Sequence, residues 1–343
     1  FVNRGGIALN YFRVTGLLKD GNNRISGVMT SDMNSGQEHL VRGRLVINAT
    51  GVFADEIHRM DDPMSKPTIR PSQGIHLVLD GSFLQSRSAL MIPKTDDGRV
   101  LFAIPWFGKV VTGTTDTPLD RISREPRALD SEIDFILGTA GRYLVRMPGR
   151  DDILCIFAGL RPLAADPANP GSTREISRRH KIIISRSGLL SIVGGKWTSY
   201  RRMAEETIDR GIKAGMLPYR KCVTRNLKLY DNNQVLKAER LKIYGNRAKE
   251  IENMTDEDPE LGVRISSKLP YTRAEIIWIC RNEMPLTLED MLARRTRALI
   301  LDARASLEMA PETARLMAGE MGFDEKWVTE QTNAYGQLIE SYL

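Results

Sequence analysis

The first 50 residues alternate between apolar and polar side chains. A period of two is typical of strands that bury one face. Two runs rich in glycine and asparagine, at 21–23 and 34–36, interrupt the alternation and predict turns. The pattern therefore predicts a meander of strands at residues 8–18, 24–30, 39–44 and 45–48, the last of them a buried apolar run.

The same alternation returns between residues 70 and 118, where Asp96-Asp97-Gly98 indicates a hairpin turn. The stretch from Ser131 to Arg146 instead repeats its apolar residues every three to four positions, which predicts a helix. A loop rich in Ala, Asp, Pro and Gly is expected at 164–173. The strands predicted in this middle part are 74–79, 89–92, 100–105, 110–115, 153–160 and 181–185.

The last third of the chain has helical spacing of its apolar residues. A helix is predicted at 199–215, and a polar connection follows at about 216–240. Further helices are predicted at 273–282, 287–303, 312–319 and 325–343. We therefore expect an α+β fold class in which the tail forms a separate, all-helical domain.

Composition narrows the class of protein. The chain has 343 residues, of which 41% are hydrophobic, so it has room for two or three domains with sizeable cores. It contains no apolar run of membrane-spanning length and no visible signal peptide. The three cysteines lie far apart and the four histidines have no paired spacing. We expect neither a disulfide framework nor a metal site, which fits a cytoplasmic protein.

The net charge of +6 points to an acidic partner: phosphate substrates, anionic lipid or nucleic acid. Nucleic acid is the weakest of these, because the basic residues are dispersed among acidic ones and the aromatic residues are few. We therefore expect no nucleic-acid partner.

The turn Gly194-Gly195-Lys196 carries the strongest chemical signal. It follows the apolar run 189–193 and precedes the predicted helix, so the order is strand, glycine turn, helix. Two glycines let the backbone approach a ligand closely, and the unpaired N–H groups at a helix start favour an anion. Taken alone, the same residues are typical of an ordinary strand-to-helix turn.

Several motifs stand in one order along the chain. They are the runs 46–51 (Val-Ile-Asn-Ala-Thr-Gly), 71–78 (Pro-Ser-Gln-Gly-Ile-His-Leu-Val), 102–106 (Phe-Ala-Ile-Pro-Trp), 113–118 (Gly-Thr-Thr-Asp-Thr-Pro), 158–163 (Ala-Gly-Leu-Arg-Pro-Leu), 177–178 (Ser-Arg), the glycine turn and 289–297 in the tail. In this order they resemble the FAD-dependent glycerol-3-phosphate dehydrogenase family, part of a wider group that includes D-amino-acid oxidase and sarcosine oxidase. The resemblance covers nearly the whole chain.

The resemblance implies FAD as cofactor and sn-glycerol 3-phosphate as substrate. The reaction would oxidise this substrate to dihydroxyacetone phosphate by hydride transfer from C2 to FAD, and a quinone or another acceptor would take the electrons. It also implies a division into parts: a remainder of an FAD-binding α/β domain at 1–53 and 188–215, a mixed, largely antiparallel substrate-domain sheet at 54–187, a linker at 216–239 and the helical domain at 240–343.

The resemblance assigns roles to particular residues. His76 would take the proton of the C2 hydroxyl, Arg161 and Arg178 would bind the substrate, and Lys196 would place a cation beside the flavin. We count these four residues as catalytic and expect them to point into one cleft. The residues expected to contact FAD are Val14, Ala49, Thr50, Gly51, Gly194, Gly195, Lys196 and Thr198.

Each of these residues also has an ordinary structural explanation when taken alone. A strand histidine such as His76 is commonly a hydrogen-bonded core residue, and an arginine such as Arg161 commonly forms a structural ion pair. Arg178 stands beside Arg179 and fits a solvated charge run. The basic cluster Arg294-Arg295-Thr296-Arg297 fits a solvated helix face better than a membrane-binding surface.

The chain departs from the family in one respect. The family opens with a Gly-x-Gly-x-x-Gly turn that holds the FAD pyrophosphate, and the Gly5-Gly6 pair does not match that motif. By analogy with the family and from usual domain sizes, we expect about a third of the parent protein to precede Phe1. The expectation for this chain alone is that it does not hold FAD tightly.

Two other functions stay open at this point. One is an amine-oxidising relative of the glycine, sarcosine or D-amino-acid oxidase type, which would use one arginine for a carboxylate. The other is an inactive fragment of the dehydrogenase. Contact with the inner face of the cytoplasmic membrane and a homodimer are also open.

Overall fold

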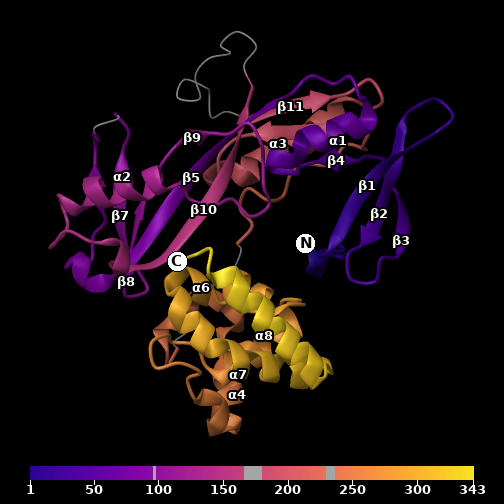
Figure 1. Cartoon of the computed structure of the whole chain (residues 1–343). Coiled ribbons are helices and arrows are strands. Elements are labelled where there is room, and N and C mark those ends of the chain that lie inside the picture. Colours follow the sequence, from indigo (N-terminus) through magenta and orange to yellow (C-terminus); the bar gives the residue numbers. More distant parts are fainter. Residues whose placement is uncertain (96–97, 166–179, 229–235) are drawn as a thin grey trace. The chain divides into compact units, whose positions relative to one another are not determined.

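The computed structural model describes residues 1–95, 98–165, 180–228 and 236–343 (Figure 1). By their internal contacts they form two compact units. The first unit holds residues 1–73, 116–126 and 160–227, and the second holds 74–115, 127–159 and 228–343. The fold class is α+β, as the sequence predicted.

The first unit contains two three-stranded sheets. Strands β1 (Phe12–Lys19), β2 (Ile25–Asp32) and β3 (Glu38–Arg42) form an antiparallel meander, which confirms the first three strands of the predicted one. The fourth predicted strand, at 45–48, was wrongly placed in this meander and belongs to the other sheet. In the other sheet, β12 (Leu190–Gly194) lies between β11 (His180–Ile184), which is antiparallel to it, and β4 (Ile47–Asn48), which is parallel.

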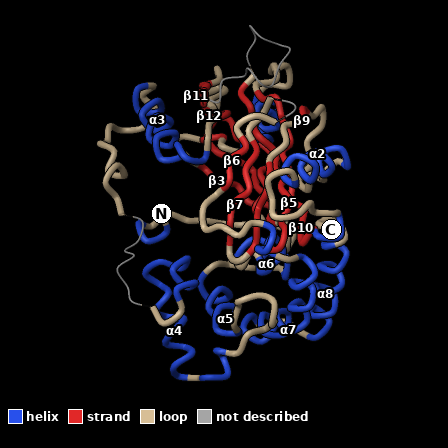
Figure 2. Tube along the Cα trace, turned by 90° about the vertical axis from the view of Figure 1, so that its left-hand side faces the viewer, coloured by secondary structure: helices blue, strands red, loops and turns tan. Residues whose placement is uncertain are grey.

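Among its described residues, the first unit contains two α-helices. Helix α3 (Tyr200–Lys213) lies alongside β11 and β12 (Figure 2), and a side chain at Gly211 would approach Leu45 Cδ2 to 3.1 Å. The glycine therefore allows the helix to pack closely. Helix α1 (Ala54–Asp61) follows the turn 51–53 directly and was not predicted.

A six-stranded sheet has the order β10-β5-β8-β7-β6, with β9 paired to β5. Its long strands β5 and β10 contribute residues to both units. The bounds are β5 Ile69–Asp80, β6 Leu90–Ile92, β7 Leu101–Trp106, β8 Lys109–Gly113, β9 Thr117–Pro118 and β10 Ile153–Ala164. These strands confirm the alternation of the middle part. The loop expected at 164–173 lies almost wholly outside the described residues.

The middle of β5 is buried on both faces within the second unit. Ile75, Leu77 and Leu79 share a core with helix α2 (Asp130–Gly141), whereas Val78 joins the core of the helical tail. Because side chains alternate across a strand, His76 faces the same way as Val78. The period of two thus places the histidine on the tail side of the strand.

The helical tail packs against strand β10 in the same unit. The amide of Ile156 donates to the Tyr342 carbonyl at 2.8 Å, and Arg304 Nη1 donates to the Ile153 carbonyl at 3.1 Å. The helices are α4 Ala248–Glu257, α5 Arg273–Asn282, α6 Ala298–Leu301, α7 Ala303–Met321 and α8 Glu325–Ile339, and Figure 2 shows α4, α5, α7 and α8 gathered together. Among the described residues, none of the helices combines the length and the apolar character needed to cross a bilayer.

The tail differs from its prediction in three places, one of which is the start of α7 at Ala303 and not at 312. The single helix expected at 287–303 is a π-helical turn, Asp290–Arg295, followed by the short α6, because Arg297 adopts a left-handed φ of 61° between them. Helix α4 was not predicted.

Candidate functional site

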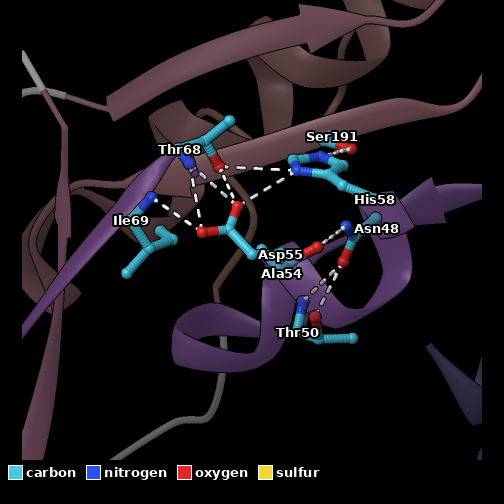
Figure 3. Close-up of polar contacts among 8 residues, drawn as sticks. All are labelled: Asn48, Thr50, Ala54, Asp55, His58, Thr68, Ile69 and Ser191. Atoms are coloured by element: carbon cyan, nitrogen blue, oxygen red, sulfur yellow. Dashed lines mark hydrogen bonds and ion pairs between the residues drawn. The ribbon is translucent and has the colours of Figure 1, made fainter. Parts of the chain in front are cut away.

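A buried asparagine closes the loop that follows strand β4. Asn48 is 2% exposed, and its Nδ2 donates to the Ala54 carbonyl at 3.0 Å (Figure 3). Its Oδ1 accepts from the Thr50 hydroxyl at 2.8 Å and from the Thr50 amide at 3.3 Å. These bonds fix the turn that carries the predicted residues Ala49, Thr50 and Gly51.

The first turn of α1 is tied to the start of β5 by one carboxylate. Asp55 accepts bonds from the Thr68 amide, the Thr68 hydroxyl at 2.6 Å and the Ile69 amide at 3.2 Å (Figure 3). Burial acts to raise the pKa of Asp55, but the hydrogen bonds from Thr68, Ile69 and His58 outweigh it and the pKa is lowered. The ionised carboxylate therefore stabilises this junction.

A histidine links the same helix to strand β12. His58 is 8% exposed, and its Nε2 lies 2.8 Å from the Ser191 hydroxyl while its Nδ1 lies 3.3 Å from Asp55 Oδ1. Ser191 itself is 1% exposed, in the middle of a sheet. The serine, histidine and aspartate thus join three elements and hold the backbone beside the glycine turn in place.

The glycine turn opens onto a cavity of about 470 Å³ within the first unit. Gly194 and Gly195 have φ values of 75° and 91°, a conformation that favours glycine. A Cβ on Gly195 would also lie 2.5 Å from Met203 Cε and 3.2 Å from His180 Cβ. The residues lining the cavity are Ile47, Ala49, Pro162, Ile192, Gly194, Gly195, Lys196, Trp197, Tyr200, Met203, Ala204, Thr207 and Ile208.

Of the residues predicted to contact FAD, Ala49, Gly194, Gly195 and Lys196 line this cavity together. Val14 and Thr50 line a second cavity of about 310 Å³, which Asn48 also lines. Gly51 starts the turn after β4 with a φ of 62°, and Thr198 is exposed in the short turn before α3. The structure therefore brings four of the predicted residues to one cavity and two to another.

Arg161 lies on strand β10, and hydrogen bonds orient its guanidinium. Its Nη1 donates to the Gln73 carbonyl at 3.0 Å and to Asp116 Oδ1 at 3.3 Å. The side chains of Arg161 and Asp116 are 27% and 16% exposed, so the ion pair is partly shielded from water. The guanidinium is therefore neither fully buried nor freely moving.

His76 lies on strand β5 within the second unit. Its ring stacks on that of Phe157, with centroids 5.1 Å apart and planes inclined by 11°. Opposite it on β8 stands Gly113, where a Cβ would lie 2.5 Å from His76 Cδ2. The imidazole is thus bounded by an aromatic face and by a backbone that carries no side chain.

Comparison with known proteins adds the decisive observation. The model of the family described as "FAD dependent oxidoreductase" matches residues 1–201. The chain belongs to the FAD-dependent oxidoreductase family. The model described as "C-terminal domain of alpha-glycerophosphate oxidase" matches residues 187–328. Both matches confirm the resemblance drawn from the motifs.

Individual members of this flavoprotein family are similar over nearly the whole chain. The chain is 37% identical to "Glycerol-3-phosphate dehydrogenase, mitochondrial" of Mus musculus, and the alignment covers 94% of this chain and 48% of that protein. Identity and coverage are the same for "Probable glycerol-3-phosphate dehydrogenase, mitochondrial" of Caenorhabditis elegans. The structure of the glycerol-3-phosphate dehydrogenase of Bacillus halodurans complexed with FAD superposes with a TM-score of 0.83 at 28% identity, covering 99% of this chain and 71% of that one. The chain spans about half the length of the curated relatives it matches.

That the four residues predicted to be catalytic point into one cleft stays a prediction. Arg161 and Lys196 belong to the first unit and His76 to the second, and Arg178 lies outside the described residues. The division of the chain into five segments also stays a prediction.

Sequence reasoning missed Asn48, Asp55, His58 and Asp116. Asn48 and Asp116 stand inside the motifs 46–51 and 113–118, and their place in these motifs is the only signal that the sequence offers for them. The partners of Asp55 and His58 come from other segments, which the sequence does not reveal.

Proposed function

We propose that this protein is an FAD-dependent glycerol-3-phosphate dehydrogenase, of which this chain is a part, and that it oxidises sn-glycerol 3-phosphate to dihydroxyacetone phosphate. The observation that carries the proposal is similarity at 36–37% identity, over 94–95% of this chain, to mammalian enzymes that bear this name. The similarity of the Bacillus halodurans enzyme across 99% of the chain supports it further.

The residues around the glycine turn fit a flavin. Gly194 and Gly195 put no side chain between the backbone and the cavity, and their positive φ values favour glycine at both positions. Ala49 lines the same cavity. Lys196 precedes the turn 197–199 and is exposed, so its ammonium can reach a ligand there. When bound, FAD would accept the hydride. The chain's own part is to admit the ring and to hold a cation beside it.

The substrate side rests on Arg161, Arg178 and His76. A guanidinium fork suits a phosphate or the negative charge that develops on the C2 oxygen, and Arg161 is already oriented by its two contacts. His76 would take the proton of the C2 hydroxyl, since an imidazole titrates near neutral pH. The ring stacks on Phe157, and Gly113 leaves room for it where a Cβ would clash.

The electrons would pass to a quinone or another acceptor, with the protein on the cytoplasmic side of the membrane. The basic cluster in the tail does not support a membrane contact of its own. Arg294 pairs with Asp290 at 3.0 Å and with Glu289, and Arg295 Nε donates to the Glu283 carbonyl at 2.9 Å. These arginines are therefore engaged within the helical unit.

The test is flavin reduction in the full-length, FAD-loaded protein. Mixing it anaerobically with sn-glycerol 3-phosphate should bleach the flavin absorbance, whereas glycine, sarcosine and D-alanine should not. Bleaching by an amine and not by glycerol 3-phosphate would overturn the proposal in favour of an amine oxidase. Subsequent addition of a soluble quinone or of oxygen would identify the acceptor.

A separate measurement addresses the chain by itself. If the cavity at the glycine turn is only part of the flavin site, the isolated chain should lose FAD on gel filtration. Retention of a stoichiometric flavin absorbance would contradict this expectation.

A further inference from the structure

Asp116 occupies a position that the backbone fixes before any ligand arrives. It stands directly before β9, whose residues Thr117 and Pro118 pair with Gln73 and Ser72 of β5. The Ser72 hydroxyl donates to Asp116 Oδ1, and Ser72 and Gln73 are 0% and 3% exposed. Strand register and a buried hydroxyl together define where this carboxylate lies.

Arg161 donates hydrogen bonds to the carboxylate of Asp116 and to the backbone of strand β5. Its Nη1 donates both to Asp116 Oδ1 at 3.3 Å and to the Gln73 carbonyl at 3.0 Å. Gln73 lies on β5 and Asp116 directly precedes β9, and the pairing of these two strands fixes the two acceptors relative to each other. A guanidinium bound to two such acceptors loses most of its rotational freedom in advance.

The arrangement has an electrostatic cost that a purely attractive phosphate site would avoid. A carboxylate beside the arginine offsets its charge and repels an anionic substrate. An exposed ion pair would contribute little to stability, and this one is only partly shielded. The ion pair of Asp116 with Arg161 is therefore better suited to orienting the guanidinium than to increasing its affinity for an anionic substrate.

We propose that Asp116, held by Ser72, is a positioning residue that aims the guanidinium of Arg161 at the reacting part of the substrate. This inference rests on the proposed function, in which Arg161 stabilises negative charge during oxidation. It assigns Asp116 an effect on kcat that acts through Arg161, and only a small effect on substrate binding.

The first experiment measures steady-state kinetics of Asp116→Asn in the full-length, FAD-loaded protein. The amide keeps the size of the side chain but loses the charge-assisted bond, so kcat should fall by about tenfold or more. KM for glycerol 3-phosphate should rise by less than about threefold, because the change also removes a repelling charge. Flavin absorbance and Tm should stay near those of the unmodified protein.

The decisive experiment is a double-mutant cycle with Arg161→Lys. If Asp116 acts through the guanidinium, the double variant should be no slower than Arg161→Lys alone. Losses that multiply, or an unchanged kcat in Asp116→Asn, would overturn the inference. Near-normal turnover in Arg161→Lys itself would instead contradict the role of Arg161 in the proposed function, so the two failures are distinguishable.

Two further variants keep the test interpretable. Asp134→Asn removes a carboxylate from a surface pair with Arg150 (2.7 Å, Asp134 65% exposed) and should leave kcat and KM unchanged. Should Asp116→Asn fail to fold, Ser72→Ala releases the carboxylate and enters the same cycle. Its loss of kcat should likewise vanish in the Arg161→Lys background, and persistence of that loss would overturn the inference.

Discussion

Gly113 is the position where one methyl group should disable the proposed proton acceptor. Gly113→Ala would place a Cβ 2.5 Å from His76 Cδ2, 2.9 Å from its Cγ and 2.8 Å from the Ile75 carbonyl oxygen. The imidazole is also stacked on Phe157, with ring centroids 5.1 Å apart, so a shift of the ring would disturb that contact too. Relief therefore requires the ring, the strand or both to shift.

The size of the effect follows from these distances. Overpacking by one methyl group in a close-packed sheet costs about 1–3 kcal/mol of folding free energy. A displacement of the catalytic group by about 1 Å can lower turnover by about 10²-fold. We expect kcat to fall by about that factor, while flavin content is unchanged.

The assay is turnover of glycerol 3-phosphate by the FAD-loaded protein, with Tm measured in parallel. Gly138→Ala is the matched control, since Gly138 lies inside α2 in the same unit and a Cβ there would meet no atom within 4 Å. That change should be neutral or stabilise the helix by about 0.5–1 kcal/mol.

The explanation through the histidine can be refuted in a His76→Ala background. Gly113→Ala should add little further loss there, because the ring that it displaces is gone. If the two losses multiply, the glycine matters for the strand and not for His76. Unchanged kcat in Gly113→Ala alone would refute the reasoning altogether.

Several elements were predictable from local pattern. Burial alternates over the first four residues of β1 and of β2, as a period of two requires. The apolar run before Gly194 forms β12, and α5 has the predicted bounds 273–282. The short helix α1 was missed because its eight residues are held by long-range contacts, such as Asp55 with Thr68. The break at Arg297 was missed because a left-handed φ at an arginine has no local signal.

The candidate site was predictable only where the residue types of a short motif determine its backbone conformation. The Gly194-Gly195 turn is such a case, since its positive φ values explain why both residues are glycine. The stacking of Phe157 on His76 and the bond from Arg161 to Asp116 join residues more than 40 positions apart. No pattern within one segment encodes such contacts, so only the folded structure reveals them.

Three further predictions concern the flavin turn, the partly buried carboxylate of Asp55 and the buried carboxylate of Glu275. Gly195→Ala should weaken FAD binding in a flavin titration, because φ is 91° there and Met203 Cε lies 2.5 Å from the position of the new methyl group. Gly215→Ala is the control for backbone strain alone, since φ is 73° there and a Cβ would meet no atom within 4 Å. Equal FAD affinities in the two variants would contradict the assignment of Gly195 to the flavin site. Asp55→Asn should lower stability at pH 7 by about 1–3 kcal/mol. The pKa of Asp55 is lowered in the folded protein, so the ionised carboxylate stabilises the fold at pH values above its unfolded pKa of about 3.9. The difference in the free energy of unfolding between Asp55→Asn and the parent, measured in urea, should therefore shrink as the pH falls below that value. A difference that persists in acid would contradict this. Glu275→Gln should destabilise the second unit most: Glu275 is 0% exposed and accepts bonds from Arg240, from the Tyr244 hydroxyl at 3.1 Å and from the Thr272 amide at 3.0 Å. Neutralising it leaves a partly buried guanidinium without its counter-charge, which costs about 3–5 kcal/mol. Glu308→Gln is the control: it breaks an exposed ion pair with Lys268 and should lower the free energy of unfolding by at most about 1 kcal/mol. Similar urea midpoints for Glu275→Gln and Glu308→Gln would contradict a stabilising role of the buried Glu275 charge.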